Sequence, residues 1–309
     1  MTYGELYLQG KGRLLDAGVA EAELEARLLL EFVCKTGRND LLVHGDREVD
    51  GNQVSAYNIL IGQRRERVPL QYLTGVQEFM GLEFQVDRHV LIPRQDTEIL
   101  AEEVLRNLHD GMAVLDMCTG SGCILISLLH YSNNCRGVGA DISEEALVMA
   151  RRNAERLLGA AASDGGQQGF FGPKILEEKP GEEAITDRIR FIKSDLYEQI
   201  SDKFDIIVSN PPYICSEVID TLMPEVREYE PRSALDGGKD GLYFYRRIIE
   251  GSKKHLFGGG MLFLEIGYDQ RESVTTLMEQ AGFLEIHAVK DYSGLDRVVY
   301  GTRGFEICR

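Results

Sequence analysis

The chain is short of positive charge. Its 309 residues include 34 lysines and arginines against 50 aspartates and glutamates, which gives a net charge of -16. Non-specific binding of nucleic acid needs basic side chains that displace counterions from phosphate, so this balance disfavours it. The densest basic cluster, Arg64, Arg65 and Arg67, is expected to be a solvated helix face. We therefore expect no direct nucleic-acid binding.

Other features are also missing. The six cysteines form no CxxC pair and no Cys/His grouping with zinc spacing, so we expect no metal site and free thiols in a reducing cytoplasm. No apolar run approaches the ~20 residues that a membrane span needs. The N-terminus lacks the basic segment followed by an apolar one that marks a signal peptide. A cytoplasmic protein without membrane attachment is expected.

Residues 1–74 are rich in helix formers. The apolar side chains Leu24, Leu28 and Leu29 recur at helical spacing, and a second helix is expected over residues 53–67. This segment carries no evident catalytic grouping. It is consistent with a small helical bundle that recognises a substrate, and equally with a purely structural cap.

The rest of the chain changes character. Residues 75–93, in which Phe79 and Phe84 flank Gly81, predict a hairpin that links two domains. Residues 94–309 alternate strands and helices, which favours a doubly wound, mostly parallel α/β sheet. Residues 159–188 interrupt the alternation and are expected to form a surface insertion. Strands are expected at 113–117, 137–141, 189–193, 204–208 and 261–266, and near 284–289 and 297–300.

The motif Asn210-Pro211-Pro212-Tyr213 follows an apolar strand. Two consecutive prolines fix φ and remove two backbone donors, while their carbonyls remain as acceptors beside the asparagine oxygen and an aromatic ring. A planar –NH2 group has two N–H donors and a π face, which these acceptors and this ring match. The motif therefore indicates chemistry on an amide or exocyclic amine nitrogen.

A second site lies earlier in the domain. Thr119-Gly120-Ser121-Gly122 joins a strand to a helix, where glycines let the backbone approach a ligand closely. Asp141 ends the next strand, where it can hold both ribose hydroxyls. Asp195 follows the third strand, where its carboxylate can meet an adenine amine while Leu196 packs on the ring. Each aspartate alone could be a helix cap or turn residue, but acids at successive carboxyl ends of strands favour one shared pocket.

The glycine pattern of this loop limits which cofactor it is expected to bind. It lacks the third glycine of GxGxxG, and the chain has no GxxxxGK[ST] loop, so ATP hydrolysis is not expected. Adenosine recognition without a pyrophosphate cradle favours S-adenosylmethionine over NAD.

The motifs together resemble a known family. Residues 115–122, including Asp116, resemble the first motif of class I S-adenosylmethionine-dependent methyltransferases. Asn-Pro-Pro-Tyr resembles the amino-methyltransferase signature, which adenine-N6 DNA and guanine-N2 rRNA methyltransferases share. Residues 91–98 (LIPRQDTE) and 230–242 (EPRSALDGGKDGL) resemble the release-factor glutamine methyltransferases, the HemK/PrmC family. The resemblance covers the whole chain.

The resemblance implies a fold, a reaction and a set of site residues. The fold is a seven-stranded class I methyltransferase sheet with an N-terminal helical bundle joined by a β-hairpin. The reaction is methylation, from S-adenosylmethionine, of the side-chain amide N5 of the glutamine in the Gly-Gly-Gln loop of peptide-chain release factors. Asn210 and Pro211 accept the amide hydrogens, Tyr213 packs on the amide plane, and Pro212 completes the substrate site. The cofactor residues are Cys118, Thr119, Gly120, Ser121, Gly122, Asp116, Asp141, Asp195, Leu196, Asn210, Arg94, Thr97 and Glu98.

The sequence departs from the family pattern at two site positions. Cys118 stands where the common motif has glycine, and we expect an ordinary φ there. Leu196 stands where some relatives carry an aromatic residue. We therefore expect it to contact the adenine ring by apolar packing and not by aromatic stacking. No histidine is expected near the motifs, and the reaction as envisaged needs no strong general base.

Two other functions stay open. A nucleic-acid methyltransferase acting on adenine N6 or guanine N2 is allowed by the motif, but the acidic balance and the lack of a basic aromatic-bearing domain oppose it. A cofactor-binding scaffold without catalysis is disfavoured because it has no need of the Asn-Pro-Pro-Tyr loop.

Overall fold

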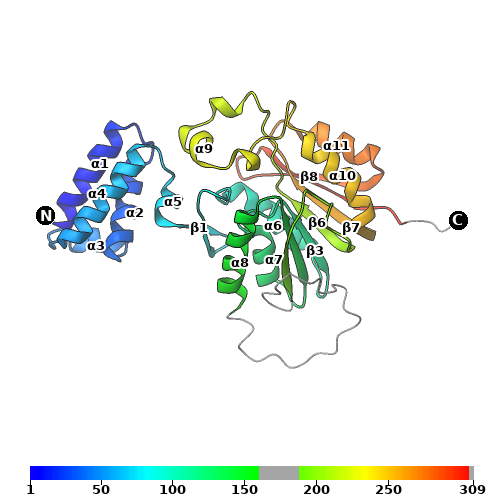
Figure 1. The fold of residues 1–309 in the computed structure, drawn as a ribbon, viewed down its shortest axis with the longest axis horizontal. Helices are drawn as coiled ribbons and strands as arrows, with labels where there is room; N and C mark the ends of the chain where they lie inside the picture. The colour runs from blue at the N-terminus through cyan, green and yellow to red at the C-terminus, as the bar shows by residue number, and fades with distance from the viewer. Residues whose placement is uncertain (160–187, 306–309) are drawn as a thin grey trace. The chain divides into compact units, whose positions relative to one another are not determined.

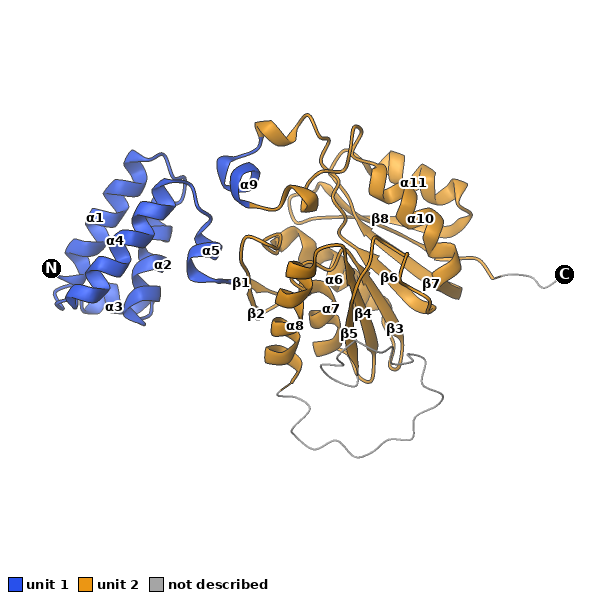
Figure 2. Ribbon diagram, in the orientation of Figure 1, with its two compact units in different colours: residues 1–76, 222–229 blue, residues 77–221, 230–309 orange. Residues whose placement is uncertain are grey.

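The computed structural model describes residues 1–159 and 188–305, which form two compact units (Figure 2). The first unit contains Met1–Val76 and Leu222–Tyr229, and the second contains Gln77–Thr221 and Glu230–Arg309. Apart from its two end residues, the expected insertion at 159–188 lies outside the described residues.

The first unit is a helical bundle around a small apolar core. Leu6, Leu29 and Tyr57, from three different helices, are fully buried in it. A capping box begins the first helix: the Thr2 hydroxyl accepts from the Glu5 amide, and the Glu5 carboxylate accepts from the Thr2 amide. The helices are α1 (Tyr3–Asp16), α2 (Ala22–Cys34), α3 (Arg38–Val43), α4 (Gly51–Arg65), α5 (Leu70–Thr74) and, from far along the chain, α9 (Pro224–Tyr229).

The basic cluster at the end of α4 is not a solvated face. Arg64 is only 5% exposed, and its guanidinium donates to the Glu25 carboxylate of α2 and, at 2.9 Å, to Glu225 of α9. Arg67 pairs with the same Glu225 at 2.9 Å, whereas Arg65 is exposed. The expectation of a solvated face was wrong for Arg64 because its acidic partners come from other helices, one of them remote in sequence.

The second unit confirms the predicted α/β class. A two-stranded hairpin, β1 (Val76–Phe79) and β2 (Leu82–Gln85), runs from the end of the first unit and precedes a seven-stranded sheet of order β5-β4-β3-β6-β7-β9-β8. The sheet is parallel except for β9, which runs antiparallel to both neighbours. Its strands are β3 (Ala113–Met117), β4 (Arg136–Asp141), β5 (Ile189–Lys193), β6 (Phe204–Ser209), β7 (Leu256–Glu265), β8 (Phe283–Lys290) and β9 (Asp296–Arg303).

Helices cover both faces of this sheet (Figure 1). One face packs on α6 (Gln95–Asn107), α7 (Cys123–His130) and α8 (Glu144–Leu158), and the other on α10 (Tyr243–His255) and α11 (Arg271–Gln280). Because successive side chains of a strand point to opposite faces, strands buried on both sides read as continuous apolar runs. Two short 3₁₀ helices, Ile219–Thr221 and Arg232–Ala234, lie in the long connection after β6.

The strand order positions the site. The chain runs from β3 outward to β4 and β5, then returns to β6 on the other side of β3, so the order reverses between β3 and β6. Ligands of open α/β sheets bind at such a switch point, at the carboxyl ends of the strands. Met117 pairs with Ser209, and the Ser209 hydroxyl donates to the Met117 carbonyl at 2.6 Å. The loops that begin at Cys118 and Asn210 therefore start side by side.

Within the described ranges, no helix is both long and apolar enough to cross a membrane. The five cysteines in those ranges, Cys34, Cys118, Cys123, Cys135 and Cys215, are free thiols.

Gly10 packs closely on Tyr57 in the helical unit, and a substitution there tests this contact. A Cβ added to Gly10 of α1 would lie 1.9 Å from the hydroxyl of the buried Tyr57, which donates to the Ala26 carbonyl at 3.1 Å. We expect Gly10→Ala to lower the free energy of unfolding of this unit by about 1–3 kcal/mol, the usual cost of overpacking. Amide hydrogen exchange across α1, α2 and α4 in the full chain measures the change.

Gly12 on the same helix provides the control, because an added Cβ there meets nothing within 4 Å. Gly12→Ala is expected to be neutral or to stabilise α1 by up to about 1 kcal/mol. Equal protection in the two variants would contradict the packing argument.

Candidate active site

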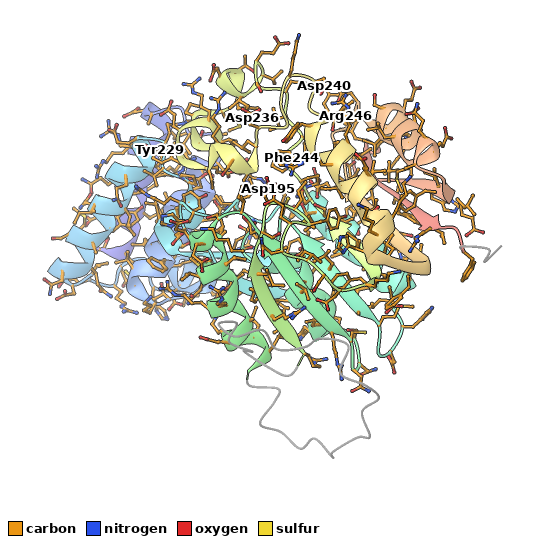
Figure 3. All side chains as sticks on the ribbon, turned by 45° about the vertical axis from the view of Figure 1, so that its right-hand side comes forward. Asp195, Tyr229, Asp236, Asp240, Phe244 and Arg246 are labelled. Carbon is orange, nitrogen blue, oxygen red and sulfur yellow. The ribbon has the colours of Figure 1, made fainter. Side chains whose placement is uncertain are left out.

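A cavity of about 240 Å³ opens at the carboxyl ends of β3, β4, β5 and β6. Most of the cofactor residues predicted from the sequence line it. Figure 3 labels Asp195, Asp236 and Phe244, which approach it from the end of β5, from the loop before α10 and from α10 itself. The predicted residues on its wall are Arg94, Thr97, Cys118, Thr119, Gly120, Ser121, Asp141, Asp195, Leu196, Asn210 and Pro212.

The loop after β3 turns through left-handed backbone. Cys118 has φ 62°, Gly120 φ 55° and Gly122 φ 79°. The expectation of an ordinary φ at Cys118 was wrong: the position keeps the conformation that glycine favours, at a cost of roughly 1–2 kcal/mol for a residue with a Cβ. Burial raises the pKa of the Cys118 thiol, so the thiol stays protonated and is a poor nucleophile.

Two acids hold this loop in place. Asp116 is fully buried beneath it and accepts from the Thr119 hydroxyl at 2.6 Å. Burial raises the pKa of Asp116 to about 7. Asp141 at the end of β4 accepts from the Gly120 amide and from the Ser143 amide, both at 2.9 Å. Asp141 therefore lies on the cavity wall, whereas Asp116 lies behind the loop and does not line the cavity.

The end of β5 supplies a third acid and an apolar side chain. Asp195 accepts from Arg247 of α10 at 2.9 Å, and this ion pair is about one-third exposed. Leu196 beside it is 6% exposed and has φ 51°, so it also adopts the left-handed region. The Arg247 partner was not predicted from the sequence.

The segment before α6 closes one side of the cavity. Arg94 donates two hydrogen bonds, at 2.6 and 2.7 Å, to the buried carboxylate of Glu230. These contacts join the two segments, 91–98 and 230–242, that carry the family resemblance. Glu98 instead accepts from the Met80 amide at 2.7 Å and does not line the cavity.

A histidine also lies here, against expectation. His89 lines the cavity, and its Nδ1 atom is 3.0 Å from the Asp87 carboxylate. His89 stands just before the segment 91–98 in the sequence, so the expectation of no histidine near the motifs was wrong.

The Asn-Pro-Pro-Tyr loop contributes unequally to the cavity wall. Asn210 and Pro212 line the cavity, but Pro211 and Tyr213 do not. Asn210 donates from Nδ2 to the Thr97 hydroxyl oxygen at 3.2 Å. The Tyr213 hydroxyl donates to the carboxylate of Glu265, at the end of β7, at 3.3 Å. Among the described residues, none donates to the Asn210 side-chain oxygen, which leaves that acceptor available.

Residues 235–241 clamp this loop from outside. A Cβ on Gly237 would lie 2.7 Å from the Tyr213 Cα, and one on Gly241 would lie 2.4 Å from the Tyr213 carbonyl oxygen. The Gln270 amide donates to that same carbonyl at 2.9 Å. These glycines permit a backbone approach that no other residue type allows.

Sequence reasoning missed Glu265. It is 2% exposed at the carboxyl end of β7, the same sheet edge as the other acids. Burial raises its pKa to about 7. The available signal was an acid at the end of an otherwise apolar strand.

Two family models match parts of the chain. The family model described as PrmC N-terminal domain matches residues 5–75, and that described as Eco57I restriction-modification methylase matches residues 137–263. A release factor glutamine methyltransferase of Geobacter sulfurreducens is 40% identical over 95% of this chain and 94% of its own. One of Caulobacter vibrioides is 37% identical over 98% of this chain and 97% of its own.

Among solved structures, the hMettl16 catalytic domain in complex with the MAT2A 3'UTR hairpin 6 aligns with a TM-score of 0.53. The alignment covers 83% of this chain and 84% of that one at 13% identity, so the likeness supports the fold alone. The two relatives at 37–40% identity, each aligned over nearly the whole of both chains, decide the family. The chain belongs to the release factor glutamine methyltransferases.

Proposed function

We propose that the protein transfers a methyl group from S-adenosylmethionine to the side-chain amide N5 of the glutamine in the Gly-Gly-Gln motif of peptide-chain release factors. The observation that carries the proposal is the orientation of Asn210. Its –NH2 group is held by Thr97, and its oxygen has no donor among the described residues, on the wall of the cavity beside the glycine loop.

The cavity residues suit the cofactor. Gly120 has no Cβ to block the wall, Asp141 offers a carboxylate for ribose hydroxyls, and Leu196 and Phe244 offer apolar surface for a base. One carboxylate oxygen of Asp195 accepts from Arg247, and the other can accept from an exocyclic amine. When bound, S-adenosylmethionine supplies an electrophilic methyl group on a sulfonium.

The substrate amide needs orientation more than a base. Its nitrogen is a poor nucleophile because the lone pair is delocalised into the carbonyl. In the proposal, the Asn210 oxygen and the Pro211 carbonyl accept its two hydrogens, so that one face of the nitrogen is presented for in-line attack. Acceptors fixed in this way stabilise the positive charge that grows on nitrogen. The nitrogen would gain the methyl group as the sulfur–methyl bond breaks, which would leave a neutral thioether, and it would release one proton to solvent.

We further propose that residues 1–74 form the substrate-recognition domain and that the enzyme works in the cytoplasm, where its substrate acts in translation. The bundle presents apolar side chains to solvent: Leu8 is 63% exposed, Leu42 78% and Ile59 63%. Such side chains suit a protein partner better than a polyanion.

Transfer of a labelled methyl group tests the function. The protein is incubated with labelled S-adenosylmethionine and with release factor, DNA, RNA or no acceptor. We expect label in the release factor alone. Label in nucleic acid would support an adenine or guanine methyltransferase instead, and absence of label throughout would support a non-catalytic scaffold.

Asn210→Ala removes the proposed acceptor of the substrate amide. We expect kcat to fall by at least about 100-fold, in line with the loss of one preorganised hydrogen-bonding group. Cofactor affinity, measured by calorimetry, should change little. Near-normal turnover on release factor would refute the role of Asn210.

Asp141→Ala removes the proposed ribose acceptor and frees the Gly120 amide. We expect the Kd for the cofactor to rise by about ten- to a hundredfold, the loss of a hydrogen bond to a charged group. Glu144→Ala is the matched control, because that carboxylate pairs with Arg151 and does not line the cavity. Unchanged affinity in Asp141→Ala would exclude the ribose contact.

A further inference from the structure

Asp195, the acid proposed to accept from an exocyclic amine, lies in a turn whose backbone is fixed by hydrogen bonds. The Ser194 amide donates to the Asp141 carbonyl at 2.9 Å, and the Ser194 hydroxyl donates to the Leu196 carbonyl at 2.6 Å. The Gln199 amide donates to the Ser194 hydroxyl at 3.0 Å. These bonds set the backbone position of Asp195, but they do not orient its partly exposed carboxylate.

Arg247 of α10 orients that carboxylate. Its Nη1 atom donates to Asp195 Oδ1 at 2.9 Å and to the Tyr243 hydroxyl oxygen at 3.3 Å. The guanidinium carbon lies 5.5 Å from the centre of the Tyr243 ring, which stands one turn earlier in the same helix and within the range of cation–π attraction. The guanidinium is therefore held by Tyr243 while it holds one oxygen of Asp195.

The helix that carries Arg247 is packed tightly against the same turn. Ile248, the next residue in α10, is fully buried, and its carbonyl accepts from the Tyr197 hydroxyl at 3.1 Å. A Cβ added to Gly251 of α10 would lie 2.3 Å from the Tyr197 ring. The turn and the helix thus meet at two bonded points, Asp195 with Arg247 and Tyr197 with Ile248. Arg247 therefore stands on a support that is fixed relative to the turn.

The two members of the ion pair differ in their access to the cavity. Asp195 lines the cavity, and so does Phe244 of α10, but Arg247 and Tyr243 do not. A ligand in the cavity therefore meets the carboxylate and not the guanidinium. Asp195 Oδ1 accepts from Arg247, whereas Oδ2 has no donor among the residues that the structure describes. A carboxylate oxygen in this state matches an N–H donor such as an exocyclic amine.

We propose that Arg247 is a positioning residue that holds one oxygen of Asp195 and thereby presents the other to the exocyclic amine of adenine. Arg247 would in this way help the site to select adenine over a base that lacks the amine, because a site built to hydrogen-bond a donor rejects the analogue without it. This inference rests on the proposed function. Arg247 touches neither the cofactor nor the reacting atoms in this arrangement.

Binding of two unreactive ligands to the full chain tests the role. One is S-adenosylhomocysteine, and the other is its analogue in which hydrogen replaces the 6-amino group. Calorimetry gives both Kd values. Asp195→Ala should raise the Kd for S-adenosylhomocysteine about ten- to a hundredfold, the loss of a hydrogen bond to a charged group. Arg247→Ala leaves the acceptor in place without its orientation, so we expect a smaller rise of about three- to tenfold.

The analogue separates positioning from general damage to the fold. It cannot donate to Asp195, so its Kd should stay within about twofold of wild type in both variants. Arg247→Met keeps the length of the side chain without its charge and should behave as Arg247→Ala does. Arg246→Ala is the matched control, because Arg246 of the same helix donates to Asp240 at 3.2 Å and neither of these two residues lines the cavity (Figure 3). Its Kd values for both ligands should match those of wild type.

The double variant Asp195→Ala with Arg247→Ala tests whether Arg247 acts through the carboxylate. It should bind S-adenosylhomocysteine as weakly as Asp195→Ala alone, because two residues that act through one contact do not give additive losses. A further loss in the double variant would mean that Arg247 acts on the ligand by another route, and would overturn the inference. Equal losses for the two ligands in Arg247→Ala, or an unchanged Kd for S-adenosylhomocysteine there, would overturn it as well.

The wild-type protein distinguishes failure of the inference from failure of the proposed function. If the wild type does not bind S-adenosylhomocysteine, the proposed function and the inference fall together. If it binds the two ligands equally well, the contact between Asp195 and the amine is absent, and the inference alone is overturned.

Discussion

Two glycines pack directly on the backbone of the Asn-Pro-Pro-Tyr loop, and the site depends on that contact. Added Cβ atoms at Gly237 and Gly241 would come within 2.7 and 2.4 Å of Tyr213 backbone atoms. The Ile214 amide bonds to Leu235 at 3.0 Å, and the Gly237 amide to Ile214 at 2.8 Å. The two prolines have no backbone N–H and cannot donate such bonds. Their position is imposed by neighbours, and so is that of Asn210.

Acids gather at the carboxyl edge of the sheet, and each is stabilised by a different partner. Asp116 accepts from a hydroxyl, Asp141 from two backbone amides, Asp195 from a guanidinium and Glu265 from a phenol. Burial alone favours the neutral acid, and hydrogen bonds and cations favour the charged one. Asp195 has a charged partner, and its side chain is 36% exposed. Glu265 and Asp116 have neutral partners, and their pKa values rise to about 7.

The sheet and its order of strands and helices were predictable because fully buried parallel strands leave continuous apolar runs. Residues 113–117 and 189–193 were placed with their observed bounds for this reason. The buried face of the helical bundle was harder to infer. Leu24 fits the apolar spacing of α2 but is 40% exposed, while Ala22 and Ala26 are buried. Small residues are buried where two helix backbones come close together. The spacing of large apolar side chains does not reveal such positions.

In the site, residues that act through the backbone or line the sheet edge were predictable, and residues that act through a partner were not. Asp141 ends β4 and Asn210 follows β6, and both side chains line the cavity. Arg247, Glu230 and Glu265 matter through contacts with Asp195, Arg94 and Tyr213, each made across more than 50 residues of sequence. The left-handed φ at Cys118 was missed because residue type argued against it.

The central claim is that the acceptor is a side-chain amide held by Asn210. Fragmentation mass spectrometry of release factor, after incubation with the protein and S-adenosylmethionine, locates the methyl group most directly. The account predicts one methyl group on the side-chain nitrogen of the glutamine in the Gly-Gly-Gln motif. A methyl group on another residue, or an unmodified glutamine after complete incubation, would contradict it.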